Sequence, residues 1–466
     1  MDLNHYIDSD EAFSVLLARQ DWSTFITGAI RDRPHPPLHG MLLYLIGQLH
    51  LDIAVCGRIL GVSASITGFL LLTRMVWQQT ACRMLAATVL LVFGFSSFFV
   101  YRSLTIRPYS IIIGLGSVQL YFFMAMLTQA SGRNTKIMPG DPALRWWLLS
   151  SVLLAGAQYL SAPVTAAQCL MLFACLQREA GKRLIAVFSI AVLALLFWYY
   201  LGSVDAPGLT ETWWVTAPPG GRQLMFTMLT FFGLAPISAL WLAALLAMIY
   251  SNAMWHWRAL EVSDWALAGV ALAPVLAIFI ISRLGPLNLF AQRQLMVPAL
   301  AFVILTCTLT RFMPRMPQWS CLFLIIAWAA SSLPMGLPRF SKPPFEAMAN
   351  VFAAHHVQQV LASSWELPGL RYYARSRFVV TGWPAKTATA ASFTPGTGFV
   401  CRPEKCGAVA HAIRHSSVRM CAQALAWNMM NYQLSGQVLF FLPQALLNPG
   451  ETCADPSVFD KGAATP

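Results

Sequence analysis

The sequence predicts a polytopic α-helical membrane protein, with about ten transmembrane helices and a small extracytoplasmic α/β domain at the C-terminus. Hydrophobic residues make up 57% of the 466 residues and charged residues only 11%, whereas soluble domains average about 25% charged residues. Apolar runs of about 20 residues, enough to cross a bilayer as a helix, recur as far as residue 337. We expect a polar segment with interfacial helices at 1–52, a transmembrane domain at 53–337 and the C-terminal domain at 338–466.

The expected spans follow directly from the apolar runs. They are 53–77, 83–101, 108–129, 145–161, 163–177, 183–202, 224–250, 264–283, 293–313 and 318–335. The fourth and fifth are short and meet at Ser161-Ala162-Pro163, so we expect a tight hairpin there. The run from Leu38 to Leu49 is too short to span and is expected to lie at the membrane surface.

The formal net charge of +12 does not indicate nucleic-acid binding, because most basic residues lie in short loops between apolar runs. Cytoplasmic loops of membrane proteins are enriched in Lys and Arg. One set of alternate loops holds the larger share, namely Arg74, Arg83, Arg133, Lys136, Arg145, Arg178, Lys182, Arg183, Arg258, Arg311 and Arg315. The other set holds Arg102, Arg107, Arg222, Arg283 and Arg293. We therefore expect the second set, the N-terminal segment and everything after Leu337 outside the cytoplasm.

The C-terminal domain is polar and rich in proline. Its pattern predicts helices at Phe345–Leu361 and Leu370–Arg375, strands at Phe378–Val380 and Val438–Leu442, and a loop at Thr387–Gly398. Four cysteines fall in this region, namely Cys401, Cys406, Cys421 and Cys453. An even number suits one or two disulfides in an oxidising compartment, and a zinc site is the alternative.

The polar segment ahead of the first span contains two motifs whose side chains could take part in a reaction. Asp10 and Glu11 open a predicted short helix that ends at Arg19. A carboxylate near the membrane surface can act as a general base, although an acid at this place can also be a helix cap. In His35-Pro36-Pro37-Leu38 the prolines hold His35 in an extended conformation, where its ring can reach a phosphate. A rigid loop leading into a helix is the other interpretation.

Arginines recur at the expected outer boundary of the spans. Arg102 and Arg107 lie in Tyr101–Tyr109, Arg283 ends the eighth span, and Arg293 begins the ninth. Arginine at this depth is costly unless it pairs or binds an anion, and its fork suits phosphate. Snorkelling, or pairing with the acids at Asp8, Asp10 and Glu11, is the alternative.

Other motifs are weaker. The outward loop 203–222 carries Trp213 and Trp214, which suit an interfacial anchor or a mobile flap. Histidine pairs at His355-His356 and at His411 with His415 lack an obvious third metal ligand. No Gly-rich nucleotide loop is present, so the sequence does not indicate an ATP-driven pump.

Taken together, these motifs resemble the GT-C superfamily of membrane glycosyltransferases. The resemblance is to the branch of lipid A aminoarabinose transferases, protein mannosyltransferase-like enzymes and rhizobial core transferases. Asp10-Glu11-Ala12-Phe13 and His35-Pro36-Pro37-Leu38 match the first-loop motifs of that branch. Arg58-Ile59-Leu60-Gly61 matches its next motif loosely, Arg107-Pro108-Tyr109 is similar to its Arg-x-Tyr, and Arg293 falls where a later arginine motif is expected.

The resemblance implies transfer of a sugar from a polyprenyl-phosphate donor, with inversion, on the outer side of the cytoplasmic (inner) membrane. Asp10 would be the base, and Glu11 would support the acceptor or a metal. The donor phosphate would be held by His35, Arg107, Tyr109 and Arg293, and Arg283, Arg102 and Asp8 are further candidate residues of the site. The acceptor would be an envelope glycan, lipid or protein. A divalent metal is possible, and membrane lipids, but no nucleic acid, are the other expected partners.

Two departures from the family pattern leave alternatives open. The family generally has a span before the Asp-Glu loop, but only nine residues precede Asp10, so either the start is misplaced or a segment was lost. Thr105 also stands where the family commonly has an acid. A non-catalytic, degenerate family member is therefore one alternative, and a transporter or flippase of an anionic lipid is another.

Overall fold

The computed structural model describes residues 9–31, 36–133, 137–173, 181–182, 185, 189, 193, 200, 218–233, 239–285, 289–336, 345–362, 366–382, 396–401, 420–429, 434–443 and 446–447. The chain divides into two compact units. The first consists of Met1–Leu16 and Pro338–Pro466, and the second of Leu17–Leu337. Helix α1 (Ser9–Ala18) begins in the first unit and ends in the second.

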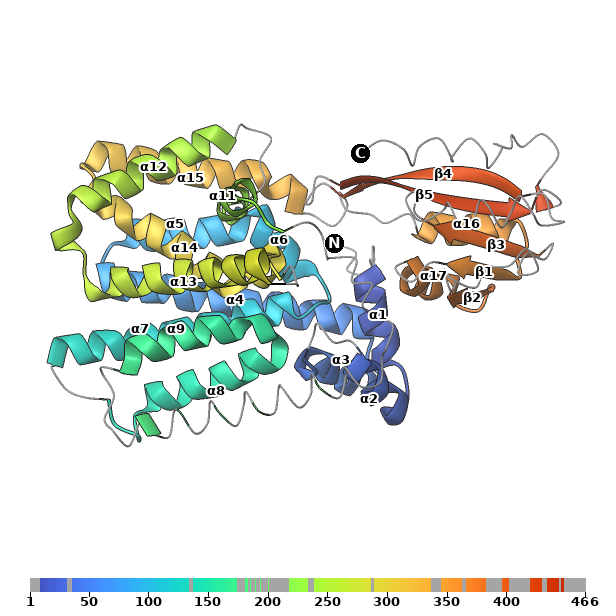
Figure 1. Cartoon of the computed structure of the whole chain (residues 1–466), viewed down its shortest axis with the longest axis horizontal. Coiled ribbons are helices and arrows are strands. Elements are labelled where there is room, and N and C mark those ends of the chain that lie inside the picture. Colours follow the sequence, from blue (N-terminus) through green and yellow to red (C-terminus); the bar gives the residue numbers. More distant parts are fainter. Residues whose placement is uncertain are drawn as a thin grey trace. The chain divides into compact units, whose positions relative to one another are not determined.

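The second unit is a bundle of helices that run alongside one another (Figure 1). In chain order its elements are α2 (Trp22–Arg31), α3 (Leu38–Gln48), α4 (Ile53–Thr80), α5 (Arg83–Phe95), α6 (Ser97–Leu104), α7 (Tyr109–Arg133), α8 (Pro142–Ala157), η1 (Tyr159–Ser161), α9 (Ala162–Phe173), α11 (Gly221–Thr230), α12 (Ala239–Trp255), η2 (Trp257–Ala259), α13 (Val262–Leu284), η3 (Gln292–Gln294), α14 (Met296–Leu309), η4 (Thr310–Phe312) and α15 (Arg315–Gly336).

Burial in the bundle follows the pattern expected of a protein in lipid. All residues of α14 are buried, as expected of a helix that is apolar on every side. In contrast, α13 exposes Leu272, Leu276 and Ile280 at a four-residue spacing, and α15 exposes Trp319 and Phe323 in the same way. Stripes of exposed apolar side chains at helical spacing are the surface that a bilayer covers.

Within the described residues, four helices are long and apolar enough to cross a membrane: Ile53–Thr80, Tyr109–Ser131, Val262–Leu284 and Arg315–Pro334. The pair α5 and α6 would be a fifth span, but it is bent by 58° at Ser96. The predicted span at 224–250 is not one continuous helix, because α11 ends at Thr230 and α12 begins at Ala239. Gly233, at φ +104, takes a backbone conformation that ends α11 and that only glycine adopts readily.

Carboxylates explain where several helices of this unit begin. Asp52 accepts from the backbone N–H groups of Ala54 and Val55 at the start of α4, and Asp141 caps α8 in the same way. Asp21 caps α2, where the hydroxyl and N–H of Thr24 donate to its carboxylate and lower its pKa. Because the pKa is lowered, this cap persists on acidification until the pH falls through that value.

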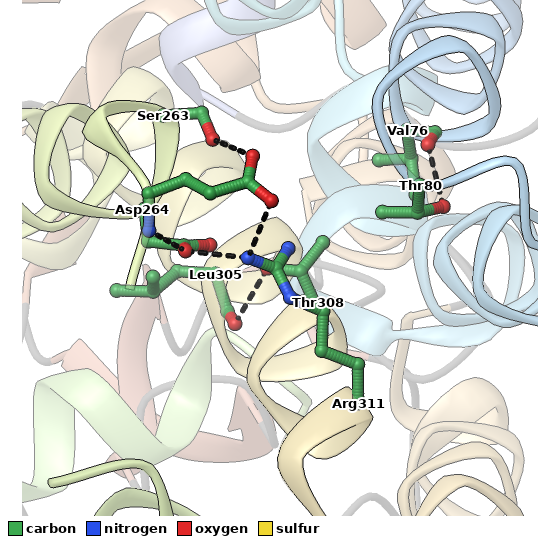
Figure 2. Close-up of polar contacts among 8 residues, drawn as sticks. Val76, Thr80, Ser263, Asp264, Leu305, Thr308 and Arg311 are labelled. Carbon is green, nitrogen blue, oxygen red and sulfur yellow. Dashed lines mark hydrogen bonds and ion pairs between the residues drawn. The ribbon is translucent and has the colours of Figure 1, made fainter. Parts of the chain in front are cut away.

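An ion pair joins the start of α13 to the end of α14 (Figure 2). Arg311 Nη2 lies 2.6 Å from Asp264 Oδ2 and 3.6 Å from Glu261 Oε1. The backbone N–H of Glu261 also donates to Asp264, at 2.8 Å. Asp264 is buried, and its Oδ2 receives both the guanidinium of Arg311 and the backbone N–H of Glu261, which offset the cost of burying its charge.

The packing of α4 against α7 requires small residues. A Cβ on Gly57 would lie 3.1 Å from Ile106, one on Gly61 would lie 3.0 Å from Ser110 Cβ, and one on Gly68 would lie 3.0 Å from Ser117 Cβ. The partner numbers rise together, so the two helices are parallel and their N-termini lie at the same end of the bundle. Close approach of backbones at glycine is typical of helix pairs in membranes.

The first unit contains a five-stranded mixed sheet with helices α16 (Phe345–Ala354) and α17 (Glu366–Ala374). The strand order is β2-β1-β3-β5-β4, with β1 (Gln359–Ala362), β2 (Val379–Gly382) and β3 (Thr397–Cys401) parallel. The hairpin of β4 (Met420–Met429) and β5 (Leu434–Pro443) adds antiparallel strands beside β3. The core contains Phe345, Met348, Phe352, Val360, Leu370 and Val400.

The sequence predicted this unit only in part. The helix expected at Phe345–Leu361 ends at Ala354, because His356 has a positive φ of 51° and β1 follows. The second helix and the strands β2 and β5 are confirmed, whereas β1, β3 and β4 were missed. Cys406 and Cys453 lie outside the described residues, so the disulfides remain a prediction.

Candidate active site

Arg102 is held among aromatic rings at the end of α6. Its guanidinium carbon lies 5.0 Å from the ring centre of Tyr109, 5.3 Å from that of Tyr101 and 5.8 Å from that of Phe98. Only 5% of Arg102 is exposed. Cation–π contact makes the cost of burying the charge smaller and fixes the direction of the side chain.

Arg107 lies in the short connection between α6 and α7 and is also buried. The connection is fixed by side chains: Thr105 Oγ1 donates to the carbonyl of Arg102 at 3.1 Å, and Ser110 Oγ donates to that of Arg107 at 3.5 Å. Tyr109, the first residue of α7, is buried, and no described residue hydrogen-bonds to its hydroxyl. A buried hydroxyl without a protein partner suits a polar ligand.

Arg58 brings a third buried guanidinium to this end of the bundle. It lies on α4 between Gly57 and Gly61, the two residues that contact Ile106 and Ser110. Arg58, Arg102 and Arg107 therefore form what we call the arginine cluster, at the N-terminal ends of α4 and α7. Arg58 matches the family motif only loosely, but an arginine six residues into an apolar helix is itself a sign of a functional site.

Arg293 lies at the same end of the bundle as the cluster. It is half-buried in η3, where the side chain of Gln294 hydrogen-bonds to that of Gln158. Gly116, seven residues into α7, packs against Val297 at the start of α14, so both helices start within roughly 10 Å of the same depth. Arg283 is exposed on α13 and makes no hydrogen bond or ion pair with a described residue, which favours snorkelling.

The two acids of the N-terminal segment lie in the first unit, within the helix α1 that was predicted there. Glu11 is buried and Asp10 is half-buried. Asp10 is inside the helix and so is not its N-cap, and its backbone carbonyl accepts from Ser14 Oγ at 3.2 Å. Asp8 and His35 lie outside the described residues, and Pro37 precedes the start of α3 as expected.

No group of three metal-binding side chains gathers anywhere in the described ranges. His355 instead bonds through Nδ1 to the backbone oxygen of Leu446, at 3.0 Å, inside the first unit. His411 and His415 fall in a range that the structure does not describe. The geometry thus supplies guanidinium and aromatic groups suited to an anion, and carboxylates on α1.

Comparison with solved structures identifies the fold. ArnT from Cupriavidus metallidurans, a lipid A aminoarabinose transferase, matches in its apo state with a TM-score of 0.59 and 13% identity, over 96% of each chain. The chain has the ArnT fold. ArnT bound to undecaprenyl phosphate matches with a TM-score of 0.57 and 14% identity over the same share of both chains. The oligosaccharyltransferase of Archaeoglobus fulgidus matches with a TM-score of 0.46 and 10% identity, over 86% of this chain and 67% of that one.

No family model matches the chain, and no curated protein matches its sequence. The ArnT fold and the apolar helices agree on a multi-pass membrane protein. The resemblance noted from the first-loop motifs is confirmed at the level of fold, since the match extends over nearly the whole chain.

Proposed function

We propose that this chain is a membrane glycosyltransferase that takes a sugar from a polyprenyl-phosphate donor and transfers it, with inversion, to a hydroxyl of an envelope acceptor. The observation that supports the proposal most is the arginine cluster, three guanidinium groups buried at one end of a membrane bundle with the ArnT fold. Arginine buried inside a membrane protein is costly and indicates a functional site, and its guanidinium suits a phosphate. The binding of undecaprenyl phosphate by ArnT gives that anion a chemical class.

In the proposed reaction each residue has one task. Asp10 removes the proton from the acceptor hydroxyl, so that its oxygen can attack the anomeric carbon. Glu11 supports the acceptor or a divalent metal. Arg107 and Arg293, with the hydroxyl of Tyr109 and the ring of His35, hold the phosphate, whose bond to the sugar breaks as the new bond forms. Arg102 and Arg283 are further candidates for holding the phosphate, and Asp8 is a further candidate residue of the site.

We further propose that the active site and the C-terminal domain face away from the cytoplasm in the inner membrane. The support is the larger share of Lys and Arg in the opposite set of loops. The C-terminal domain would then help to select the acceptor. Whether the acceptor is a glycan, a lipid or a protein is determined from the glycosylated products. Mass spectrometry of envelope glycolipids from a deletion strain would identify the acceptor directly.

A transfer assay tests the function. Purified protein in lipid nanodiscs is given a polyprenyl-phosphate sugar and an envelope lipid extract, and the products are followed by mass spectrometry. The proposal expects release of polyprenyl phosphate together with a glycosylated acceptor. Movement of the lipid across the liposome membrane without covalent transfer would instead support the flippase alternative. If the protein shows neither transfer nor lipid movement, the result would support a non-catalytic family member.

The first mutational prediction concerns donor binding. Arg107→Ala should weaken binding of polyprenyl phosphate about 10- to 100-fold, because a charge-assisted hydrogen bond contributes roughly 1.5–3 kcal/mol. Binding to purified protein in nanodiscs measures the effect. Arg222→Ala is the matched control, since Arg222 is an exposed arginine of α11 outside the cluster. Equal affinity for Arg107→Ala and the wild-type protein would remove Arg107 from the donor site.

A further inference from the structure

Helices α5 and α6 are separated by a sharp break inside the described bundle. The chain bends by 58° there, with Ser96 extended at φ −62 and ψ 123. A break inside a bundle leaves backbone N–H and C=O groups without helical partners, which is costly in a membrane. Ser96 and Ser97 are both buried, so water is not at hand to satisfy these groups.

Four side-chain hydrogen bonds lie here; one satisfies a backbone N–H group at the break, two satisfy carbonyls at the nearby end of α11, and one lies within α15. Ser332 Oγ on α15 accepts from the backbone N–H of Ser97 at 2.9 Å and donates to the carbonyl of Ala329 at 2.7 Å. Ser96 Oγ donates to the carbonyl of Phe231 at 3.2 Å. Trp328 Nε1 donates to the carbonyl of Gly233 at 3.0 Å. We call these bonds the joint.

The joint is closely packed as well as hydrogen-bonded. A Cβ on Gly233 would lie 2.7 Å from Ser332 Cβ and 3.2 Å from the backbone nitrogen of Ser97. Ser332 is fully buried, and Phe231 packs against Phe98 with ring centres 5.4 Å apart. The joint therefore fixes the first turn of α6 from two sides, by α15 and by the end of α11.

We propose that Ser332, together with Ser96 and Trp328, is a positioning residue for the donor site. These residues fix the direction of α6 and thereby place Arg102 and Arg107 where they contact the donor phosphate. The inference rests on the proposed function. Helix α6 has eight residues and is therefore about 12 Å long, so a change of about 10° at the joint moves its far end by roughly 2 Å. Arg102 is in the last turn of α6, and Arg107 follows directly. Displacements of about 1 Å are enough to weaken a preorganised site.

The experiment measures binding of undecaprenyl phosphate to the full chain in nanodiscs. Ser332→Ala should weaken binding about three- to tenfold, which corresponds to the net free energy of one hydrogen bond. Ser331→Ala is the matched control, because Ser331 is the neighbouring residue of α15 and bonds only to the carbonyl of Trp328 in its own helix. Its affinity should equal that of the wild-type protein, and the acceptor KM should be unchanged in both variants.

A second measurement separates positioning from a general loss of structure. In the Arg102→Ala/Arg107→Ala background, Ser332→Ala should add little further loss, because both side chains that it positions are gone. An equal loss in both backgrounds, wild-type affinity of Ser332→Ala, or an equal loss in Ser331→Ala would overturn the inference. If Ser332→Ala does not fold, Ser96→Ala and Trp328→Phe each delete one other bond and should weaken binding in the same way.

The outcomes also distinguish this inference from the function on which it rests. If Arg107→Ala weakens lipid binding and the joint variants do not, only the positioning role fails. If the wild-type protein binds no undecaprenyl phosphate and transfers no sugar, the proposed function itself fails. Wild-type affinity in both Arg107→Ala and Ser332→Ala would place the lipid phosphate elsewhere and end both assignments.

Discussion

Asp10→Asn should lower kcat for sugar transfer about 10³-fold, because a positioned general base contributes roughly 10²–10⁴-fold to such a reaction. Asparagine keeps the size of the side chain and can still hydrogen-bond, but it cannot take a proton from the acceptor hydroxyl. Affinity for polyprenyl phosphate should stay within about threefold of the wild-type value, since the arginines, not Asp10, hold the donor in the proposed site. Steady-state transfer in nanodiscs measures kcat, and direct binding measures the affinity for the donor.

The chain offers a matched control for this variant in the same N-terminal segment. Asp21→Asn makes the same chemical change at an exposed N-cap, where asparagine caps about as well as aspartate. It should leave both kcat and donor affinity unchanged. Near wild-type transfer by Asp10→Asn would exclude Asp10 as the base. Loss of donor binding together with loss of transfer would mean that Asp10 maintains the site instead of acting on the acceptor.

The parts of the fold that the sequence predicted are those that depend on composition alone. Helices α4, α7, α13 and α15 are long apolar runs, and any such run must form a helix in lipid. The bend at Ser96 was missed, because Phe95–Leu104 stays largely apolar across it and the bonds that permit it come from Ser332 and Phe231, distant in sequence. Strand β4 was missed because its residues, MCAQALAWNM, lack the alternation of a half-buried strand.

The sequence predicted those residues of the candidate site whose charge makes their position next to a membrane span energetically costly. Arg102 and Arg107 were singled out because arginine next to a span is expensive, and both are buried. The ring of Phe98 lies four residues before Arg102, so the helical spacing predicts that contact, whereas the contact with the adjacent Tyr101 does not follow from the spacing. The placement of Arg58 at the same end of the bundle as Arg107 depends on the parallel packing of α4 on α7. The positions of the glycines in the sequence do not by themselves specify that packing.

The second large effect is expected at Arg311, the partner of buried Asp264. Arg311→Met should lower the free energy of unfolding by roughly 3–5 kcal/mol, because it leaves a buried carboxylate without its counter-charge. Asp264→Asn should cost less, about 1–3 kcal/mol, since the side chain of Arg311 is 23% exposed and can turn toward water or lipid headgroups. Unfolding in mixed detergent micelles, followed by circular dichroism, measures both variants.

Combining the two changes tests whether the charges are coupled. The double variant Asp264→Asn/Arg311→Met should be more stable than Arg311→Met alone, because neither charge is then left unmatched. Strictly additive losses would show that the 2.6 Å contact contributes no coupling. Arg311 follows the 14 residues of α14, which place it roughly 20 Å along the helix from the end that carries Arg293. Well below its melting temperature, Arg311→Met should therefore bind polyprenyl phosphate like the wild-type protein, so that stability and donor binding are lost through different residues.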